Sequence, residues 1–97
     1  VRAMWLILQH NKSDDFVCST GISHTVKDLV KYVFNKLDLD WEKYVAVDKR
    51  YYRSEELEHL KGDCSKIKND LGWMPLYTFE TMLDEMIEYW LNNQNNL

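Results

Sequence analysis

The chain has 97 residues, of which 45% are hydrophobic and 29% are charged, with one Pro, three Gly and a formal net charge of −4. This profile is typical of one small globular domain and excludes collagen-like, low-complexity and disulfide-stapled proteins. The acidic balance gives no electrostatic reason to expect a nucleic acid or an anionic membrane as partner. The longest apolar stretch is far below the ~20 residues that span a bilayer, so we expect neither a nucleic-acid nor a membrane partner.

The first predicted element is an apolar helix over residues 1–8. A helix this apolar requires packing partners on several sides, and it begins without an N-cap. We therefore expect the chain to be a fragment of a larger protein. Its apolar side chains occupy the i, i+3, i+4 and i+7 positions of one face and much of the remaining circumference: Val1, Ala3, Met4, Trp5, Leu6, Ile7 and Leu8.

Two short runs then favour β-strands. Residues 16–20 are apolar, short and closed by Gly21, and residues 44–47 read Tyr-Val-Ala-Val. Both have the length and composition of buried strands. Two such strands are too few for an independent sheet.

Three further helices follow from caps and periodicity. Thr25 is a good N-cap, with Asp28 three residues later, for an amphipathic helix that runs to about Leu37. A short helix over residues 65–71 stops at Gly72, and Thr78 caps a last amphipathic helix. The predicted fold class is α/β, a small helix-rich lobe with about four helices and two short strands.

Cysteine and histidine usage predicts no metal centre. Cys18 and Cys64 show no C-x-x-C spacing, and the three histidines are too scattered to form a ligand set. We expect two thiols in a reducing cytoplasm rather than a disulfide.

Tyr32 and Lys36 form a Y-x-x-x-K pair, which is the catalytic spacing of short-chain dehydrogenases/reductases. The pair lies on a predicted amphipathic helix beside Val33 and Phe34, with no cofactor-binding strand or glycine fingerprint before it. We therefore interpret it as a surface Tyr and Lys one turn apart.

Residues 48–56 carry the best candidate site. They follow a predicted strand and resemble a strand-to-helix corner, where Ser54 can cap the next turn. The planar fork of Arg53 matches phosphate oxygens, and Glu56, one turn later, can accept hydrogen bonds from a ribose diol. An exposed i,i+3 ion pair of little energetic value explains the same two residues equally well.

The same segment carries a family resemblance. Residues 47–57, with Leu-Lys-Gly-Asp at 60–63 and Ser-Lys-Ile at 65–67, resemble the C-terminal signature of GDP-mannose 4,6-dehydratases. Leu-Gly-Trp-Met-Pro at 71–75 is similar to the ending of extended short-chain dehydrogenases/reductases, and residues 1–9 and 15–26 also resemble the family. Two departures are Ser54, where the family usually has Pro, and Lys27, where it often has Arg.

The resemblance implies an NADP-dependent lyase that converts GDP-mannose to GDP-4-keto-6-deoxymannose and water. Residues 1–97 would be its C-terminal substrate-binding domain, a lobe of an extended Rossmann-type enzyme without the NADP-binding Rossmann domain. The resemblance places the catalytic residues and the glycine-rich loop outside this chain, so the fragment would hold no catalytic centre and bind no cofactor. It assigns Arg53 to the GDP pyrophosphate and Glu56 to the ribose hydroxyls.

The resemblance also implies a cytoplasmic enzyme that is a homodimer or homotetramer at full length. Two alternatives stay open. The chain could be the substrate lobe of another nucleotide-sugar epimerase or reductase, or a non-catalytic helical interaction module.

Overall fold

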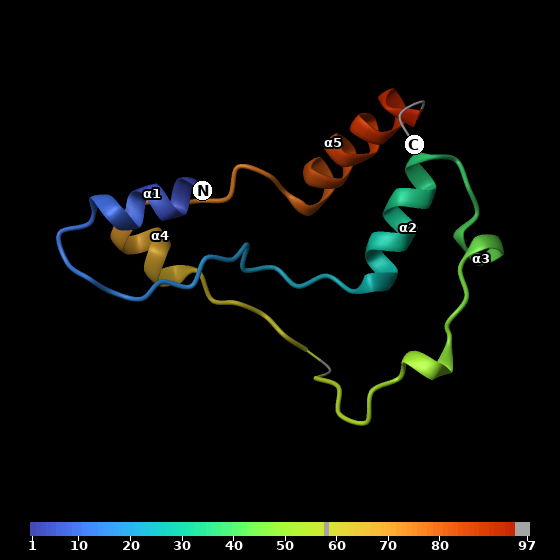
Figure 1. The fold of residues 1–97 in the computed structure, drawn as a ribbon, viewed down its shortest axis with the longest axis horizontal. Helices are drawn as coiled ribbons and strands as arrows, with labels where there is room; N and C mark the ends of the chain where they lie inside the picture. The colour runs from blue at the N-terminus through green and yellow to red at the C-terminus, as the bar shows by residue number, and fades with distance from the viewer. Residues whose placement is uncertain (58, 95–97) are drawn as a thin grey trace. The chain divides into compact units, whose positions relative to one another are not determined.

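The computed structural model of the chain describes residues 1–57 and 59–94. The chain divides into two compact units, one made of Val1–Ser23 with His59–Thr78 and the other of His24–Glu58 with Phe79–Leu97. Figure 1 labels the five α-helices in chain order, and a 3-10 helix, η1, lies between the third and fourth. Their bounds are α1 (Arg2–Gln9), α2 (Val26–Lys36), α3 (Trp41–Tyr44), η1 (Lys49–Tyr51), α4 (Ser65–Leu71) and α5 (Phe79–Asn92).

The prediction of an α/β fold with two strands is wrong for this part of the chain, because residues 1–57 and 59–94 contain helices and no strand. A strand is stabilised by ladder hydrogen bonds to a second strand, and neither apolar run has such a partner there. Residues 16–20 have no regular secondary structure. Tyr44 instead ends α3, a helix that the sequence reading missed and whose N-cap Asp40 accepts a hydrogen bond from the Glu42 amide. The helix-rich character of the lobe was predicted correctly.

The four predicted helices are confirmed close to their expected bounds. The Thr25 hydroxyl accepts from the Asp28 amide at 3.0 Å, and the Asp28 carboxylate accepts from the Thr25 amide at 2.9 Å, which completes a capping box at α2. Gly72 ends α4 in the left-handed conformation with φ 66°, which glycine adopts without a steric penalty. These ends are fixed by contacts between near neighbours in sequence.

In the first unit, Ala3 of α1 and Ile67 of α4 are the buried residues among those described. The Lys66 ammonium donates to the Asp14 carboxylate and to the Asp15 carbonyl, each at 2.8 Å. The predicted apolar helix is present, but it is not buried within this chain, since Trp5 is 61% exposed. Apolar side chains of α1, such as that of Trp5, are therefore exposed on the surface of this unit.

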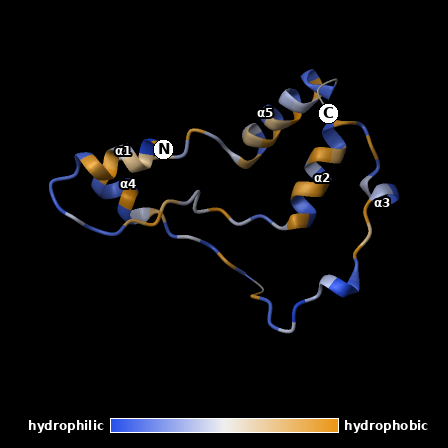
Figure 2. Cartoon of the chain, in the orientation of Figure 1, coloured by the Kyte–Doolittle hydropathy of each residue, from blue (hydrophilic) through white to orange (hydrophobic). Residues whose placement is uncertain are grey.

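In the second unit, α2 and α5 contact each other, and Leu83 of α5 is buried at 5% exposure. Figure 2 shows hydrophobic residues along both helices and a hydrophilic stretch at η1. Apolar contacts of this unit thus lie between α2 and α5. The segment that follows α3 is polar at η1.

Candidate functional site

The segment predicted to bind substrate begins with a short polar turn. Asp48 is the N-cap of η1, and its Oδ1 accepts a hydrogen bond from the Arg50 amide at 3.0 Å. The same carboxylate accepts from the Arg50 guanidinium, at 3.0 Å from Nε and 2.6 Å from Nη2. Hydrogen bonds from this guanidinium hold the pKa of Asp48 below its usual value and raise the pKa of Arg50. A charge-assisted, two-pronged pair therefore closes the turn.

Arg53 and Glu56 follow this turn, and the structure brings them together. Arg53 Nε lies 3.6 Å from Glu56 Oε1, and the two side chains are 80% and 64% exposed. Ser54 lies in a bend, and no helix follows it in the described residues before α4, so the expected strand-to-helix corner with a Ser54 cap is wrong. An exposed pair of this kind contributes little to stability, and both side chains remain open to a ligand.

A second polar site was not predicted from the sequence. It is a cavity of about 330 Å³ at the start of α2 and α5. His24 stacks on Phe79 there, with ring centroids 3.9 Å apart and planes 9° from parallel. These two residues are 55 positions apart, so no local pattern joins them. The lining residues are His24, Asp28, Lys31, Tyr32, Asn35, Phe79 and Glu80.

The Y-x-x-x-K pair lies at this helix pair and faces a carboxylate. Tyr32 Oη donates to Asp84 Oδ1 at 2.7 Å, and the Lys36 ammonium lies 3.4 Å from the same oxygen. The hydrogen bond from Tyr32 to Asp84 raises the pKa of Tyr32. The contact of the Lys36 ammonium with the same carboxylate raises the pKa of Lys36. A tyrosine that acts as a general base needs its pKa lowered towards neutrality. The pKa of Tyr32 is thus shifted in the opposite direction to the one that a catalytic tyrosine needs, and its hydrogen bond joins α2 to α5.

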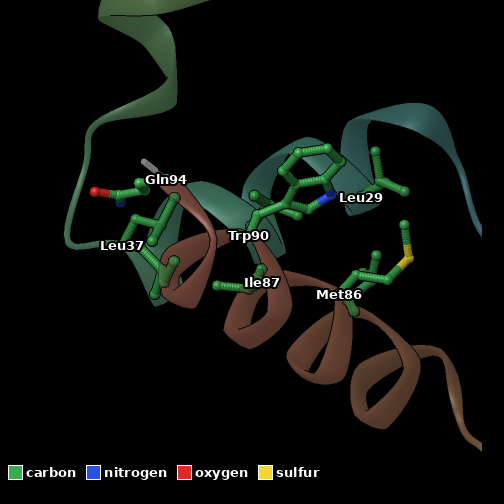
Figure 3. Close-up of a pocket in the computed structure, with 9 residues that line it drawn as sticks. Leu29, Leu37, Met86, Ile87, Trp90 and Gln94 are labelled. Atoms are coloured by element: carbon green, nitrogen blue, oxygen red, sulfur yellow. The ribbon is translucent and has the colours of Figure 1, made fainter. Parts of the chain in front are cut away.

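An apolar groove of about 410 Å³ runs between α2 and α5. Figure 3 shows that Leu29 and Leu37 of α2 and Met86, Ile87 and Trp90 of α5 line it. Gln94 supplies the one polar side chain of that lining. Such a surface does not supply the charged groups that a pyrophosphate requires.

The described part of the chain offers neither a metal cluster nor a membrane-spanning helix. Residues 1–57 and 59–94 hold no group of three or more His, Cys, Asp or Glu side chains placed to bind a metal ion. None of the helices formed by these residues is both long and apolar enough to cross a membrane.

A family model and several known proteins match this chain. The family model described as GDP-mannose 4,6 dehydratase matches residues 1–86. GDP-mannose 4,6 dehydratase 1 of Arabidopsis thaliana is 47% identical over 88 residues, which cover 91% of this chain and 24% of that protein. GDP-mannose 4,6 dehydratase of Homo sapiens is 36% identical over 104 residues, covering 90% of this chain and 28% of that protein.

A bacterial relative extends the comparison. GDP-mannose 4,6-dehydratase of Yersinia enterocolitica is 33% identical over 114 residues, covering 90% of this chain and 31% of that protein. The chain thus spans between about a quarter and a third of the length of these relatives.

Proposed function

Because the chain belongs to the GDP-mannose 4,6-dehydratase family, we propose that it is the C-terminal, GDP-sugar-binding part of such an enzyme. The whole enzyme would convert GDP-mannose to GDP-4-keto-6-deoxymannose and water, as a lyase of the extended short-chain dehydrogenase/reductase superfamily. NADP would accept hydride from C4 of the sugar and return it to C6. The family assignment of residues 1–86 is the observation that carries the proposal.

Within this proposal, Arg53 binds the GDP pyrophosphate. Its guanidinium is 80% exposed, and in the described residues its ion-pair partner is Glu56 at 3.6 Å. Exchanging an exposed pair for a phosphate costs little, because such pairs contribute about 0–1 kcal/mol at most. The planar fork can then make two parallel hydrogen bonds to phosphate oxygens.

Glu56 accepts hydrogen bonds from the ribose hydroxyls in the same proposal. Its carboxylate lies within an ion-pair distance of Arg53 and is 64% exposed. A pyrophosphate and its ribose are covalent neighbours, so groups that recognise them must lie close together. The observed spacing supports one site for both.

The catalytic centre and the NADP site are proposed to lie in the remainder of the enzyme. The Tyr32 and Lys36 pair, bound to Asp84, takes no part in hydride transfer. The isolated chain should then show no turnover of GDP-mannose with NADP, and measurable turnover would contradict the proposal. The exposed apolar side chains of α1, among them Trp5 and Leu8, support packing against the remainder.

A cytoplasmic homodimer or homotetramer is proposed for the full-length enzyme, by which we mean a dehydratase that carries these 97 residues as its C-terminal part. Cys18 and Cys64 are both free thiols, as we expect of a protein in a reducing compartment. Size measurement by analytical ultracentrifugation tests the assembly, and a monomer would contradict it.

The decisive experiment is Arg53→Ala in the full-length enzyme. Loss of hydrogen bonds to a charged group costs about 1.5–3 kcal/mol, or about 10- to 150-fold, and should appear in KM for GDP-mannose. Lys49→Ala is the matched control, because it removes one positive charge from the same exposed segment and should leave KM unchanged. Equal KM values for Arg53→Ala and the unmodified enzyme would overturn the assignment of Arg53.

A further inference from the structure

The turn before Arg53 is held by one carboxylate in two ways. Asp48 Oδ1 accepts from the Arg50 backbone amide at 3.0 Å. The two carboxylate oxygens also share the Nε–H of the Arg50 guanidinium, and Oδ2 accepts from its Nη2. Asp48 is therefore both the cap of η1 and the anchor of the side chain at its centre. Its side chain is 37% exposed, against 82% for Arg50.

This turn has few other stabilising contacts. Its backbone bonds are long, with Tyr51 N donating to Asp48 O and Tyr52 N donating to Lys49 O, each at 3.2 Å. A single turn of 3-10 helix is weak because its hydrogen-bond geometry is poor. The Asp48 side chain thus supplies the strongest local restraint on this stretch of backbone.

Arg53 comes directly after the residue that closes the turn. Tyr52 is the C-cap of η1 and is extended, with φ −68° and ψ 133°. The Arg53 side chain is 80% exposed and pairs with the exposed Glu56. The direction in which the Arg53 side chain leaves the backbone consequently depends on the η1 turn, which Asp48 restrains.

We propose that Asp48 is a positioning residue for substrate binding, which orients Arg53 through the η1 turn without touching the substrate. This inference rests on the proposed role of Arg53 at the pyrophosphate. Asp48 keeps Arg53 pre-oriented, so that less side-chain and backbone freedom is lost when the nucleotide binds. Arg50, which pairs with Asp48, is a part of the same turn.

A double-mutant cycle in the full-length enzyme tests this role. Asp48→Ala should raise KM for GDP-mannose about three- to tenfold, as expected when a capped turn is lost, with kcat unchanged. Asp48→Asn should raise KM less, because an amide oxygen still accepts from the Arg50 backbone. In an Arg53→Ala background, Asp48→Ala should change KM less than twofold, because the oriented side chain is gone.

Asp40→Ala is the matched control. Asp40 caps α3 through the Glu42 amide at 3.2 Å, in the same unit, and its loss should leave KM unchanged. An unchanged KM for Asp48→Ala, or a KM effect that is the same with and without Arg53, would overturn the positioning role even if Arg53 itself binds the nucleotide. If Arg53→Ala alone leaves KM unchanged, the proposed site fails first, which separates the two failures.

Discussion

The α2–α5 helix pair and the segment 45–57 differ in what holds them. The helix pair joins residues far apart in sequence, through the bond between Tyr32 and Asp84 and through the buried Leu83. In segment 45–57, the described hydrogen bonds and ion pairs that involve a side chain connect residues two or three positions apart. The candidate substrate-binding side chains lie in the second region, on backbone restrained by near neighbours in sequence.

This difference indicates which region contributes to the stability of the fold and which to substrate binding. Burial of apolar surface stabilises the helix pair, whereas exposed ion pairs contribute little free energy of unfolding. Ligand-binding segments are commonly drawn from the less stable parts of a protein. Segment 45–57 should therefore affect substrate binding strongly and global stability weakly, and the helix pair should do the opposite.

The largest expected effect on stability is that of Leu83→Ala. Leu83 is 5% exposed, and removing a buried leucine side chain costs about 2–5 kcal/mol of the free energy of unfolding. Hydrogen exchange of α2 and α5 amides in the full-length enzyme should become correspondingly faster. Leu57→Ala is the control in the other region, because Leu57 is 75% exposed and its loss should cost less than about 0.5 kcal/mol. A similar loss in the free energy of unfolding for both variants would contradict the proposed difference between the two regions.

A smaller effect is expected at Thr25, and none at Ser54, which are two of the N-caps predicted from the sequence. Thr25→Ala removes one half of the α2 capping box and should cost about 1 kcal/mol, seen as faster exchange in the first turn of α2. Ser54→Ala should leave exchange in segment 45–57 unchanged, because Ser54 caps no helix among the described residues. A matching loss at Ser54 would indicate a cap that the structure does not contain.

The α2 capping box should also depend on pH. Hydrogen bonding to the Thr25 amide lowers the pKa of Asp28, so the folded state favours the carboxylate. Its contribution is present above the ordinary carboxyl pKa of about 4 and is lost as the pH falls through the lowered value. Unfolding experiments with Asp28→Asn should therefore lose part of the acid dependence, and an unchanged acid profile would contradict the assignment.

Short-range features of the fold could be predicted from the sequence. The capping box joins Thr25 to Asp28, three residues away, and Gly72 ends α4 through its own backbone conformation. These signals operate within one turn of helix. The helix ends were accordingly predicted close to their observed positions.

Features that depend on a partner could not be predicted in this way. The runs at residues 16–20 and 44–47 have strand-like composition, but β-propensity becomes a strand only when a neighbour supplies the hydrogen bonds. The stacked pair His24 and Phe79 needs two helices to meet, and this is information that no local window holds. The spacing of Arg53 and Glu56 in the sequence indicated that they could pair. The bond between the Asp48 carboxylate and the Arg50 guanidinium, in contrast, could be seen only in the structure.

The smallest perturbation expected is a change in the titration of Tyr32. Its pKa is raised by the hydrogen bond to Asp84, so the folded state favours the neutral phenol. The resulting stabilisation is present below the ordinary tyrosine pKa of about 10 and is lost as the pH rises through the raised value. Asp84→Asn should move the pKa of Tyr32 back towards its ordinary value, measured by tyrosinate absorbance against a Tyr32→Phe reference.

Asp48→Asn serves as the control from the other region, because Asp48 makes its polar contacts with Arg50 and should leave the Tyr32 titration unchanged. The same experiment tests the Y-x-x-x-K motif. In a catalytic pair, the lysine would lower the pKa of Tyr32 below its ordinary value even before any substitution. The pKa of Tyr32 measured in the unmodified enzyme therefore distinguishes the two cases. A raised starting pKa, with kcat of the full-length enzyme unchanged by Tyr32→Phe, assigns this pair to the packing of α2 against α5 and leaves nucleotide recognition to the segment around Arg53.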